Sequence, residues 1–371
     1  MKINDFKLEV YFGKYEFSAP YLLTQSDCAS MTIEEILNME EGAKDSFMKM
    51  GLGYTEVPGN PELREVISSL YDTMVPDNIV VHAGAQEPIF NIMNVLLEEG
   101  DHIITQFPIY QSLFEVASSI GCDVSRWNLI DQGDRWNLNI DELETMIRPE
   151  TKLIVVNSPN NPTGHTLKRN EMERIAKIAR KHDIYVFFDE VYKGIELDQV
   201  KRPWFADLYD KGISLGVMSK SYGLAGLRIG WIASKDTELL EKAMRMKHYT
   251  SICSSGPSEY ISTIALRNSD KILNKNLQII KDNLESAREF FNEYKSLFNF
   301  IEPMAGPVAY VKMNIDKPIE EFCNELVEKH GILLLPAEIY SHEGQYFRIG
   351  LGRKDFKENL NRFRKVIESM T

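Results

Sequence analysis

Cysteine is scarce in this chain, and its four copies form no recognisable binding pattern. Cys28, Cys122, Cys253 and Cys323 are far apart, and no Cys-x-x-Cys pair occurs. This spacing indicates neither a disulfide framework nor a zinc ribbon. The seven histidines include no i, i+4 pair, so the sequence gives no support for a histidine-based metal site. We therefore predict no metal centre, and we expect reduced, buried thiols.

Long apolar runs and an excess of basic charge are also missing. No stretch approaches the ~20 apolar residues of a membrane-spanning helix, and residues 1–6 contain no apolar signal core. The formal net charge is -13, from 42 basic and 55 acidic residues. Binding to nucleic acid or to an anionic membrane needs clustered lysine and arginine, so the acidic balance disfavours both partners. We expect a cytoplasmic protein that binds neither.

The length of the chain predicts two domains. Its 371 residues exceed the size at which one hydrophobic core stops growing. We expect residues 46–268 to form a large ligand-binding domain and residues 269–371 to form a small α+β domain. Residues 1–45 should join the small domain, beginning as an irregular, aromatic-rich arm. A helix is predicted over 32–41, because Thr32 and Glu35 have the spacing of a capping box.

Apolar segments of strand length alternate with amphipathic helical segments through the middle of the chain. The predicted strands cover residues 79–82, 102–106, 153–157, 184–189, 214–219 and 229–234. This alternation is typical of a mainly parallel sheet with helices on both faces. Further on, we expect helices over 271–294, 319–330 and from 354, and strands over 308–313, 332–335 and 346–350. Ligands of open α/β sheets bind outside the carboxyl ends of the strands.

Polar residues suited to one kind of chemistry follow these predicted strands. Asp189 ends one strand and Lys220 follows another, with Tyr192, Asn161 and Arg228 in neighbouring loops. A lysine that forms a Schiff base and a carboxylate for a pyridinium nitrogen are what pyridoxal phosphate catalysis needs. An arginine suits the phosphate group, since its planar fork binds phosphate through two hydrogen bonds.

Each residue has a plainer structural alternative. Asp189 could cap a helix, Asn161 could stabilise a turn, Tyr192 could be a core residue and Arg228 could form a surface ion pair. Nucleotide sites are disfavoured, because the chain has neither a Walker loop nor a Gly-x-Gly-x-x-Gly helix start. The three glycines of residues 219–230 permit close backbone approach, and we expect a bound ring to be the reason.

Three motifs together resemble the class I and II aminotransferases, which are fold-type I pyridoxal phosphate enzymes. They are Asn-Pro-Thr-Gly at 161–164, Asp-Glu-Val-Tyr at 189–192 and Ser-Lys-Ser-Tyr-Gly-Leu-Ala-Gly-Leu-Arg-Ile-Gly at 219–230. The resemblance extends from Tyr54 to Arg348. It implies an aspartate aminotransferase-like fold, with a seven-stranded, mainly parallel sheet between helices in a large domain and a smaller α+β domain. It also implies a homodimer with shared active sites that transfers an amino group from an α-amino acid to a 2-oxo acid.

The resemblance also implies a role for each site residue. Lys220 would form the Schiff base and shuttle the proton, with Asp189 and Tyr192 as the other catalytic residues. Asp189 would meet the pyridine nitrogen, and Asn161 and Tyr192 would meet the phenolic oxygen. The other implied cofactor contacts are Ser219, Arg228 and the backbone of Gly84, Ala85 and Gln86 at the phosphate, Tyr110 on the ring, and Tyr54 at the phosphate of the partner subunit. Arg348, beside Asn161, would bind the substrate α-carboxylate.

The sequence departs from the family pattern in three places. Residues 23–28 read Leu-Thr-Gln-Ser-Asp-Cys where many members have a Gly-Glu-Pro type lid, Val217 stands where some have a phosphate-binding serine, and Pro307 follows Gly306. The lid and residues 8–12 resemble those of capreomycidine synthase-type members, so a pyridoxal phosphate-dependent β/γ-lyase or cyclase stays open as the alternative. A transcriptional regulator fits poorly, because no DNA-binding module precedes the motifs. The substrate side chain cannot be deduced from these motifs.

Overall fold

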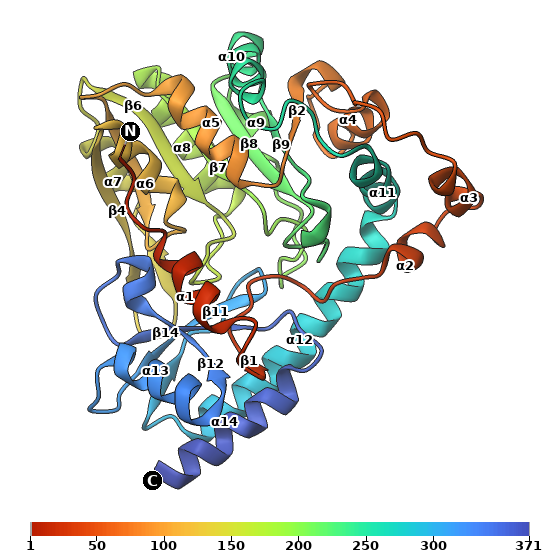
Figure 1. The fold of residues 1–371 in the computed structure, drawn as a ribbon. Helices are drawn as coiled ribbons and strands as arrows, with labels where there is room; N and C mark the ends of the chain where they lie inside the picture. Colours follow the sequence, from red (N-terminus) through yellow and green to blue (C-terminus); the bar gives the residue numbers. More distant parts are fainter. Residues whose placement is uncertain (1, 371) are drawn as a thin grey trace.

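An eight-stranded sheet forms the centre of the larger part of the molecule (Figure 1). The computed structural model describes residues 2–370. The strand order is β2-β9-β8-β7-β6-β3-β4-β5, and only β9 and β5 run antiparallel to their neighbours. The bounds are β2 (Ile79–His82), β3 (His102–Phe107), β4 (Asp123–Asp131), β5 (Trp136–Leu138), β6 (Thr151–Asn157), β7 (Tyr185–Asp189), β8 (Gly212–Val217) and β9 (Gly230–Ala233).

The six strands predicted from apolar runs are all present, and the mainly parallel sheet is confirmed. The eighth strand arises because β4 and β5 form an antiparallel hairpin at one edge. Along the second half of β4, buried Trp127 and Leu129 alternate with exposed neighbours. A strand with one exposed face has no continuous apolar run, and for this reason the sequence pattern did not reveal β4, which lies next to the edge strand β5.

Both faces of the central strands are buried, and alternate residues enter different cores. Leu153 and Val155 of β6 pack in one core, whereas Ile154 and Val156 pack in the other. The first core includes α5 (Gln86–Leu96), α6 (Ser112–Ile120) and α10 (Thr237–Lys247), and the second includes α7 (Ile140–Thr145), α8 (Arg169–His182) and α9 (Phe205–Leu208). This two-sided burial leaves the strand ends as the place where polar side chains can gather.

A third core joins the other edge of the sheet to two helices. It contains residues of β2 and β9 with α4 (Pro61–Ser68) and α11 (Gly256–Arg267). The short helices α2 (Ile33–Leu37) and α3 (Ala43–Met48) lie beside them (Figure 1). The capping box of Thr32 and Glu35 is present, but α2 ends at Leu37 and is shorter than predicted.

The smaller part is built on a four-stranded antiparallel sheet. Its order is β10 (Phe298–Phe300), β11 (Val308–Met313), β14 (Tyr346–Gly350) and β13 (Leu335–Pro336). Its helices are α13 (Ile319–His330) and α14 (Phe356–Met370), while the long α12 (Ser269–Glu293) runs between the two parts of the molecule (Figure 1). β1 (Tyr21–Leu22) pairs in parallel with β12 (Ile332–Leu333). Residues near the N-terminus are thereby fixed beside the C-terminal part of the chain.

The N-terminal arm is not irregular, as we had expected, but contains the helix α1 (Lys7–Tyr15). Leu8 packs against Leu335 and Tyr340, and Tyr15 packs against Val327 and Leu333. The prediction was wrong because tertiary packing of an apolar stripe stabilises this short helix, and local sequence alone would not.

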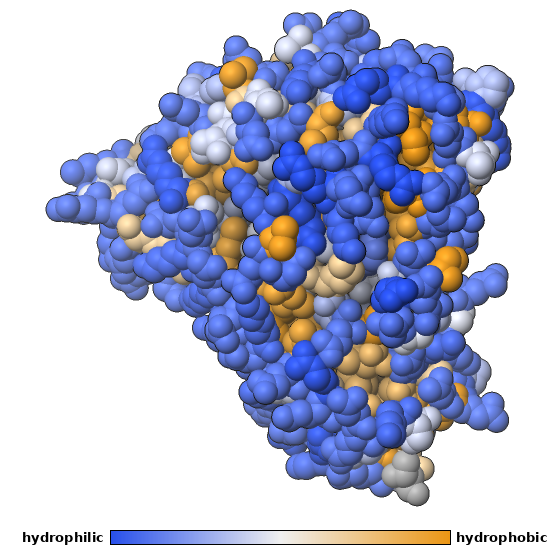
Figure 2. Space-filling view, turned by 180° about the vertical axis from the view of Figure 1, so that it is seen from behind, coloured by the Kyte–Doolittle hydropathy of each residue, from blue (hydrophilic) through white to orange (hydrophobic). Residues whose placement is uncertain are grey.

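Polar and charged residues cover most of the back of the molecule, and apolar residues reach the surface in patches (Figure 2). No helix within residues 2–370 has the length and apolar character needed to cross a membrane. Three of the four thiols are buried as predicted, but Cys253 is partly exposed.

Candidate active site

A cavity of about 360 Å³ lies at the carboxyl ends of β6, β7 and β8. Nine of the predicted site residues line it, namely Ala85, Gln86, Tyr110, Asn161, Asp189, Tyr192, Ser219, Lys220 and Arg228. Gly84 and Arg348 lie next to it, and Tyr54 lies elsewhere. A second cavity of about 440 Å³ borders α12, but none of the predicted site residues lines it.

Lys220 reaches the cavity from the turn that follows β8. Its Nζ donates a hydrogen bond to the Ser26 hydroxyl, with 3.0 Å between the two atoms. Burial lowers the pKa of Lys220, an effect that Asp27 opposes and Arg348 reinforces. A larger share of the amine is therefore unprotonated, as a nucleophile or base requires.

Asp189 is the last residue of β7, and its side chain is buried. Burial raises its pKa from 3.8 to about 7, against the lowering effects of the Val191 N–H and of Lys220. Its Oδ1 accepts from the Val191 backbone N–H at 3.1 Å. No helix begins here, so the helix-cap alternative is wrong, although the carboxylate does stabilise the turn that follows the strand.

The predicted phosphate site is a cradle of unsatisfied donors. The Ser219 hydroxyl is buried and has no hydrogen-bond partner among the described residues. Within residues 2–370 the guanidinium of Arg228 donates a hydrogen bond only to the Ala225 carbonyl oxygen, at 3.4 Å, and forms no ion pair. The surface-pair alternative for Arg228 is therefore wrong. Because α5 begins at Gln86, its free N–H groups add to a site suited to an anion.

Two glycines bring this cradle together, for a reason that differs from our expectation. A Cβ atom on Gly230 would lie 2.5 Å from the carbonyl oxygen of Gly84, and one on Gly84 would lie 2.4 Å from Arg228 Nη2. A Cβ on Gly223 would lie 2.6 Å from the Ala29 carbonyl oxygen. The close approach at Gly223 and Gly230 is therefore to other segments of the chain, whereas a Cβ atom on Gly226 would meet nothing within 4 Å, and the approach to a bound ring stays a prediction.

Arg348 is fully buried on β14 and faces only neutral oxygen atoms. Its Nη1 donates to the Tyr340 hydroxyl at 2.6 Å and to Asn161 Oδ1 at 3.1 Å. Its Nε and Nη2 donate to the Thr24 carbonyl oxygen at 3.1 and 2.6 Å. No carboxylate among the described residues pairs with it, so the guanidinium charge is not neutralised. A buried, unneutralised guanidinium is suited to binding a carboxylate.

Asn161 connects the cavity to Arg348. Its side-chain oxygen accepts from both Arg348 and Tyr340, the latter at 2.7 Å, and its backbone N–H donates to Asn157 Oδ1 at 2.7 Å. Since the oxygen is occupied, the amide N–H₂ group is the part left for a ligand.

Two tyrosines complete the lining. The Tyr192 hydroxyl is buried and makes no hydrogen bond of good geometry within residues 2–370; burial raises its pKa, against the lowering effects of Arg348 and the nearby Ser26. Tyr110 donates from its hydroxyl to Glu9 at 3.3 Å, and its ring lies 5.0 Å from that of Phe6. Tyr192 is buried like a core residue, yet its unsatisfied hydroxyl at the cavity favours a ligand contact.

Tyr54 lies in the loop before α4 and is 91% exposed. It belongs to neither cavity. This exposure agrees with an outward-pointing tyrosine, and its predicted contact with a partner subunit stays a prediction.

Several contacts in the site were not predicted from the sequence. Ser26 contacts Lys220, Tyr340 and Thr24 contact Arg348, and Glu9 lines the cavity. The unusual composition of residues 23–28 was the signal for two of these. We name this segment the strap. Backbone bonds hold it, from Gly350 N to the Leu23 oxygen (2.7 Å) and from Cys28 N to the Lys220 oxygen (3.2 Å).

The described part of the chain contains no cluster of three or more His, Cys, Asp or Glu side chains that could hold a metal ion. The unsatisfied donors and the buried carboxyl instead fit a phosphorylated, nitrogen-containing ring. Val217, where some family members have serine, lines the cavity with an apolar side chain.

Comparison with known proteins agrees with this geometry. The family model for aminotransferase class I and II matches residues 22–365. Histidinol-phosphate aminotransferase of Methanococcus maripaludis is 31% identical over 318 residues, covering 84% of this chain and 81% of that protein. A pyridoxal phosphate-dependent aminotransferase of Streptococcus suis has a crystal structure with a TM-score of 0.93 and 29% identity, covering 100% of this chain and 99% of that one.

A more distant relative bears on the alternative activity. Capreomycidine synthase of Streptomyces vinaceus is 22% identical over 294 residues, covering 79% of this chain and 74% of that protein. Its identity is lower than that of the histidinol-phosphate aminotransferase, and the matches therefore favour amino-group transfer over a cyclase. The chain belongs to the class I and II aminotransferases and is a pyridoxal phosphate-dependent enzyme.

Proposed function

We propose that Lys220 is the central catalytic residue of an aminotransferase that acts between an α-amino acid and a 2-oxo acid. The observation that carries this proposal is a buried lysine with a lowered pKa in the same cavity as a buried aspartate and a cradle of unpaired donors. Each feature has a separate use in this reaction.

The residues around the cavity fit pyridoxal phosphate. Ser219 and Arg228 would hold the phosphate with the backbone of Gly84, Ala85 and Gln86, and Tyr110 would cover the ring. When bound, this cofactor supplies an electron-accepting ring for the electrons released at the substrate Cα.

Asp189 would bind the ring nitrogen. Its raised pKa means that it holds a proton more readily than an ordinary aspartate, and a cationic N–H opposite it would favour the carboxylate. On the other side, the Asn161 amide and the Tyr192 hydroxyl would donate to the phenolic oxygen. The Tyr192 hydroxyl makes no hydrogen bond of good geometry with the described residues.

Lys220 would move the proton. Burial lowers the pKa of this amine and thereby favours its unprotonated form, in which Nζ can take the proton from the substrate Cα. The Ser26 hydroxyl accepts one N–H of this amine and thereby orients it.

Arg348 would bind the substrate carboxylate and fix the direction of the Cα–H bond. Since Tyr340 and Asn161 already orient its guanidinium, little further ordering is needed when the substrate binds. A carboxylate at Nε and Nη2 would replace the Thr24 carbonyl oxygen.

Lys220→Ala tests this assignment. The variant is expected to lose both the visible absorbance of the lysine-bound cofactor and the turnover of every amino donor. Lys242→Ala, on the exposed side of α10 in an ion pair with Glu238, serves as the control and should keep both. Retention of either property by Lys220→Ala would contradict the assignment.

The proposed active unit is a homodimer with shared sites. Large apolar side chains are exposed on two loops, at Leu52 (86%), Tyr54 (91%) and Tyr249 (90%), which suits an interface with a second copy. Mixing the inactive Lys220→Ala protein with Tyr54→Phe protein is expected to restore activity, because one site of the mixed dimer has both native residues. A mixture no more active than the sum of its components would exclude shared sites.

A lyase or cyclase is the second candidate, supported by the unusual strap. Incubating the enzyme with a single amino acid and no oxo acid separates the two. Transfer gives one turnover per site, whereas a lyase releases ammonia continuously. A cytoplasmic location stays a prediction.

A further inference from the structure

One charged group at the cavity has no role in the proposed reaction. The proposed reaction uses the charged side chains of Arg228, Asp189, Lys220 and Arg348. Glu9 of α1 also lines the cavity but has no role in that reaction. Its carboxylate accepts from the Tyr110 hydroxyl at 3.3 Å and forms no ion pair with any described residue. A carboxylate that has no ion-pair partner and lies at a ligand cavity attracts a positively charged group of the ligand.

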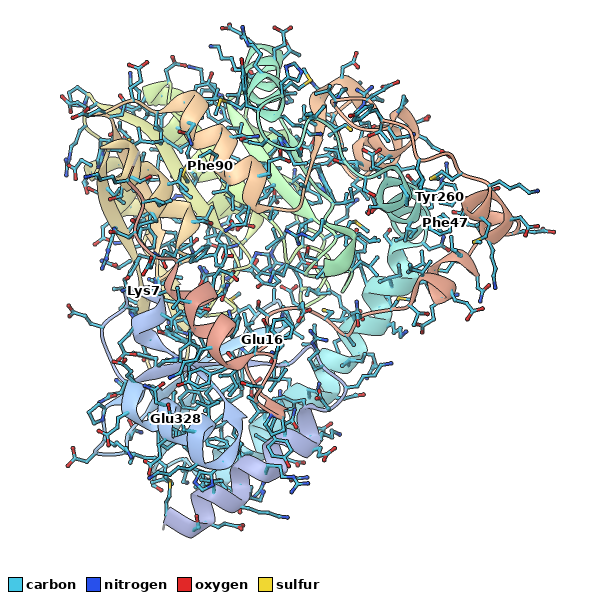
Figure 3. The ribbon with its side chains drawn as sticks, viewed as in Figure 1. Lys7, Glu16, Phe47, Phe90, Tyr260 and Glu328 are labelled. Carbon is cyan, nitrogen blue, oxygen red and sulfur yellow. The ribbon has the colours of Figure 1, made fainter. Side chains whose placement is uncertain are left out.

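A second carboxylate lies on the same side of α1. Glu16 follows Glu9 by seven residues, which is two helical turns, and therefore faces the same way. Figure 3 shows Glu16 at the end of α1, between the larger and the smaller parts of the molecule. Burial and then the nearby Asp27 raise the pKa of Glu16, and within residues 2–370 it too lacks an ion pair.

Only one of the three neighbouring carboxylates is neutralised. Asp27 is bound by Arg353 through contacts of 2.8 Å to both of its oxygens. Asp27 and Glu9 both raise the pKa of Lys220, so their charges are felt at the reacting amine. Glu9 and Glu16 therefore leave this side of the site negative.

An independent feature points to a missing ligand group here. Gln25 of the strap is 5% exposed, and its amide oxygen lacks a hydrogen-bond partner in the described chain. Its side chain lies beside Glu16, and a side-chain hydrogen bond between the two lowers the pKa of that carboxyl. A buried amide oxygen without a partner is costly, and a ligand with several N–H donors would satisfy it.

Arg348, the proposed binding residue for the substrate carboxylate, lies close to the same helix, α1. Phe12, between Glu9 and Glu16 on α1, has its ring 5.9 Å from the guanidinium carbon of Arg348. The guanidinium of Arg348 therefore borders the face of α1 that carries Glu9 and Glu16.

We propose that the substrate is an amino acid whose side chain ends in an ammonium or guanidinium group, bound by Glu9 and Glu16 with the Gln25 amide oxygen. This inference rests on the proposed function and names its substrate class. Acidic amino acids are disfavoured, because their side chains would meet two unpaired carboxylates. The proposed substrate therefore differs from aspartate, the amino acid in the names of two aminotransferases to which the chain is similar.

The first experiment measures the half-reaction of the holoenzyme with lysine, ornithine and arginine, and with norleucine and aspartate. We expect kcat/KM for the best cationic substrate to exceed that for norleucine by about 10-fold or more, with aspartate lowest. Glu9→Gln and Glu16→Gln should each reduce several-fold the ratio of kcat/KM for the best cationic substrate to kcat/KM for norleucine. Glu9→Gln keeps an acceptor for Tyr110, so it removes the charge without removing the hydrogen bond. Glu41→Gln, at an exposed position, is the matched control.

The second experiment does not depend on turnover. α-Methyllysine and α-methylnorleucine lack the Cα hydrogen, and their affinities for the holoenzyme can be compared by calorimetry. Tighter binding of α-methyllysine that is lost in Glu9→Gln supports the inference. Equal binding, or a preference unchanged in both variants, overturns it. If aspartate is converted well and the cationic substrates are not, amino-group transfer stands and this inference fails. If nothing is converted, the proposed function fails and the binding comparison still decides the inference.

Discussion

Replacing Asp189 with asparagine is expected to stabilise the cofactor-free protein at pH 8, although it removes the carboxylate that we propose binds the cofactor. The Asp189 side chain is 4% exposed, and burial is the main cause of its raised pKa. Neither its hydrogen bond from Val191 nor the nearby Lys220 compensates for the lost hydration. The ionised form of the Asp189 carboxyl is thus less favourable in the folded protein than in the unfolded chain.

The magnitude follows from the difference between the two pKa values. Asp189 ionises near 3.8 when unfolded and at about 7 when folded. Between these values the folded protein holds a proton that the unfolded chain has lost, so the free energy of unfolding decreases as pH rises through this window. One pKa unit is worth about 1.4 kcal/mol, and ionised Asp189 therefore costs the fold about 4 kcal/mol above pH 7.

Urea unfolding of cofactor-free wild type and Asp189→Asn at pH 5, 6, 7 and 8 tests this reasoning. The stability of the variant relative to wild type should rise by about 3 kcal/mol between pH 5 and pH 8, most of it below pH 7. Protein concentration is held constant, and Asp316→Asn, at an exposed position, controls for loss of one charge. A relative stability independent of pH would show that Asp189 is ionised throughout and that the reasoning is wrong.

Three further predictions concern the site. Ser26→Ala removes a hydrogen-bond acceptor from Lys220 and should lower the pKa of this amine by up to about one unit. The pKa can be measured in the cofactor-free protein from the pH dependence of the modification of Lys220 by an amine reagent. An unchanged pKa would count against the contact. Tyr340→Phe removes one hydrogen bond from Arg348 and should weaken binding of the amino acid about 10-fold or more, with unchanged cofactor absorbance. Tyr209→Phe, which loses a hydroxyl bond to a backbone oxygen, should bind normally. Dialysis against a chelator should leave turnover unchanged, because the described residues hold no metal-binding cluster, and a loss restored by a divalent metal would contradict this.

Most of the central sheet could be predicted because its strands are buried on both faces. Continuous apolar runs predicted β2, β3 and β6 to within two residues. The strand β4, next to the edge of the sheet, was missed because buried and exposed residues alternate along its second half. The helix α1 was missed because its stability comes from packing on Leu335 and Leu333. Local patterns report burial and propensity, and they carry no information about a distant packing partner.

The sequence by itself determined which residues stand at the strand ends. Asp189 ends β7 and Lys220 follows the end of β8, and because these strands run in parallel, covalent connection brings both residues to one edge of the sheet. Only the tertiary structure decided what surrounds them. Ser26 is 194 residues away from Lys220, and Thr24 is 324 residues away from Arg348. Such contacts depend on how the strap docks against β14 and the turn after β8, and no local spacing encodes that docking. For the same reason the carboxylate of Glu9, on a helix that the sequence did not predict, became visible at the cavity only in the folded chain.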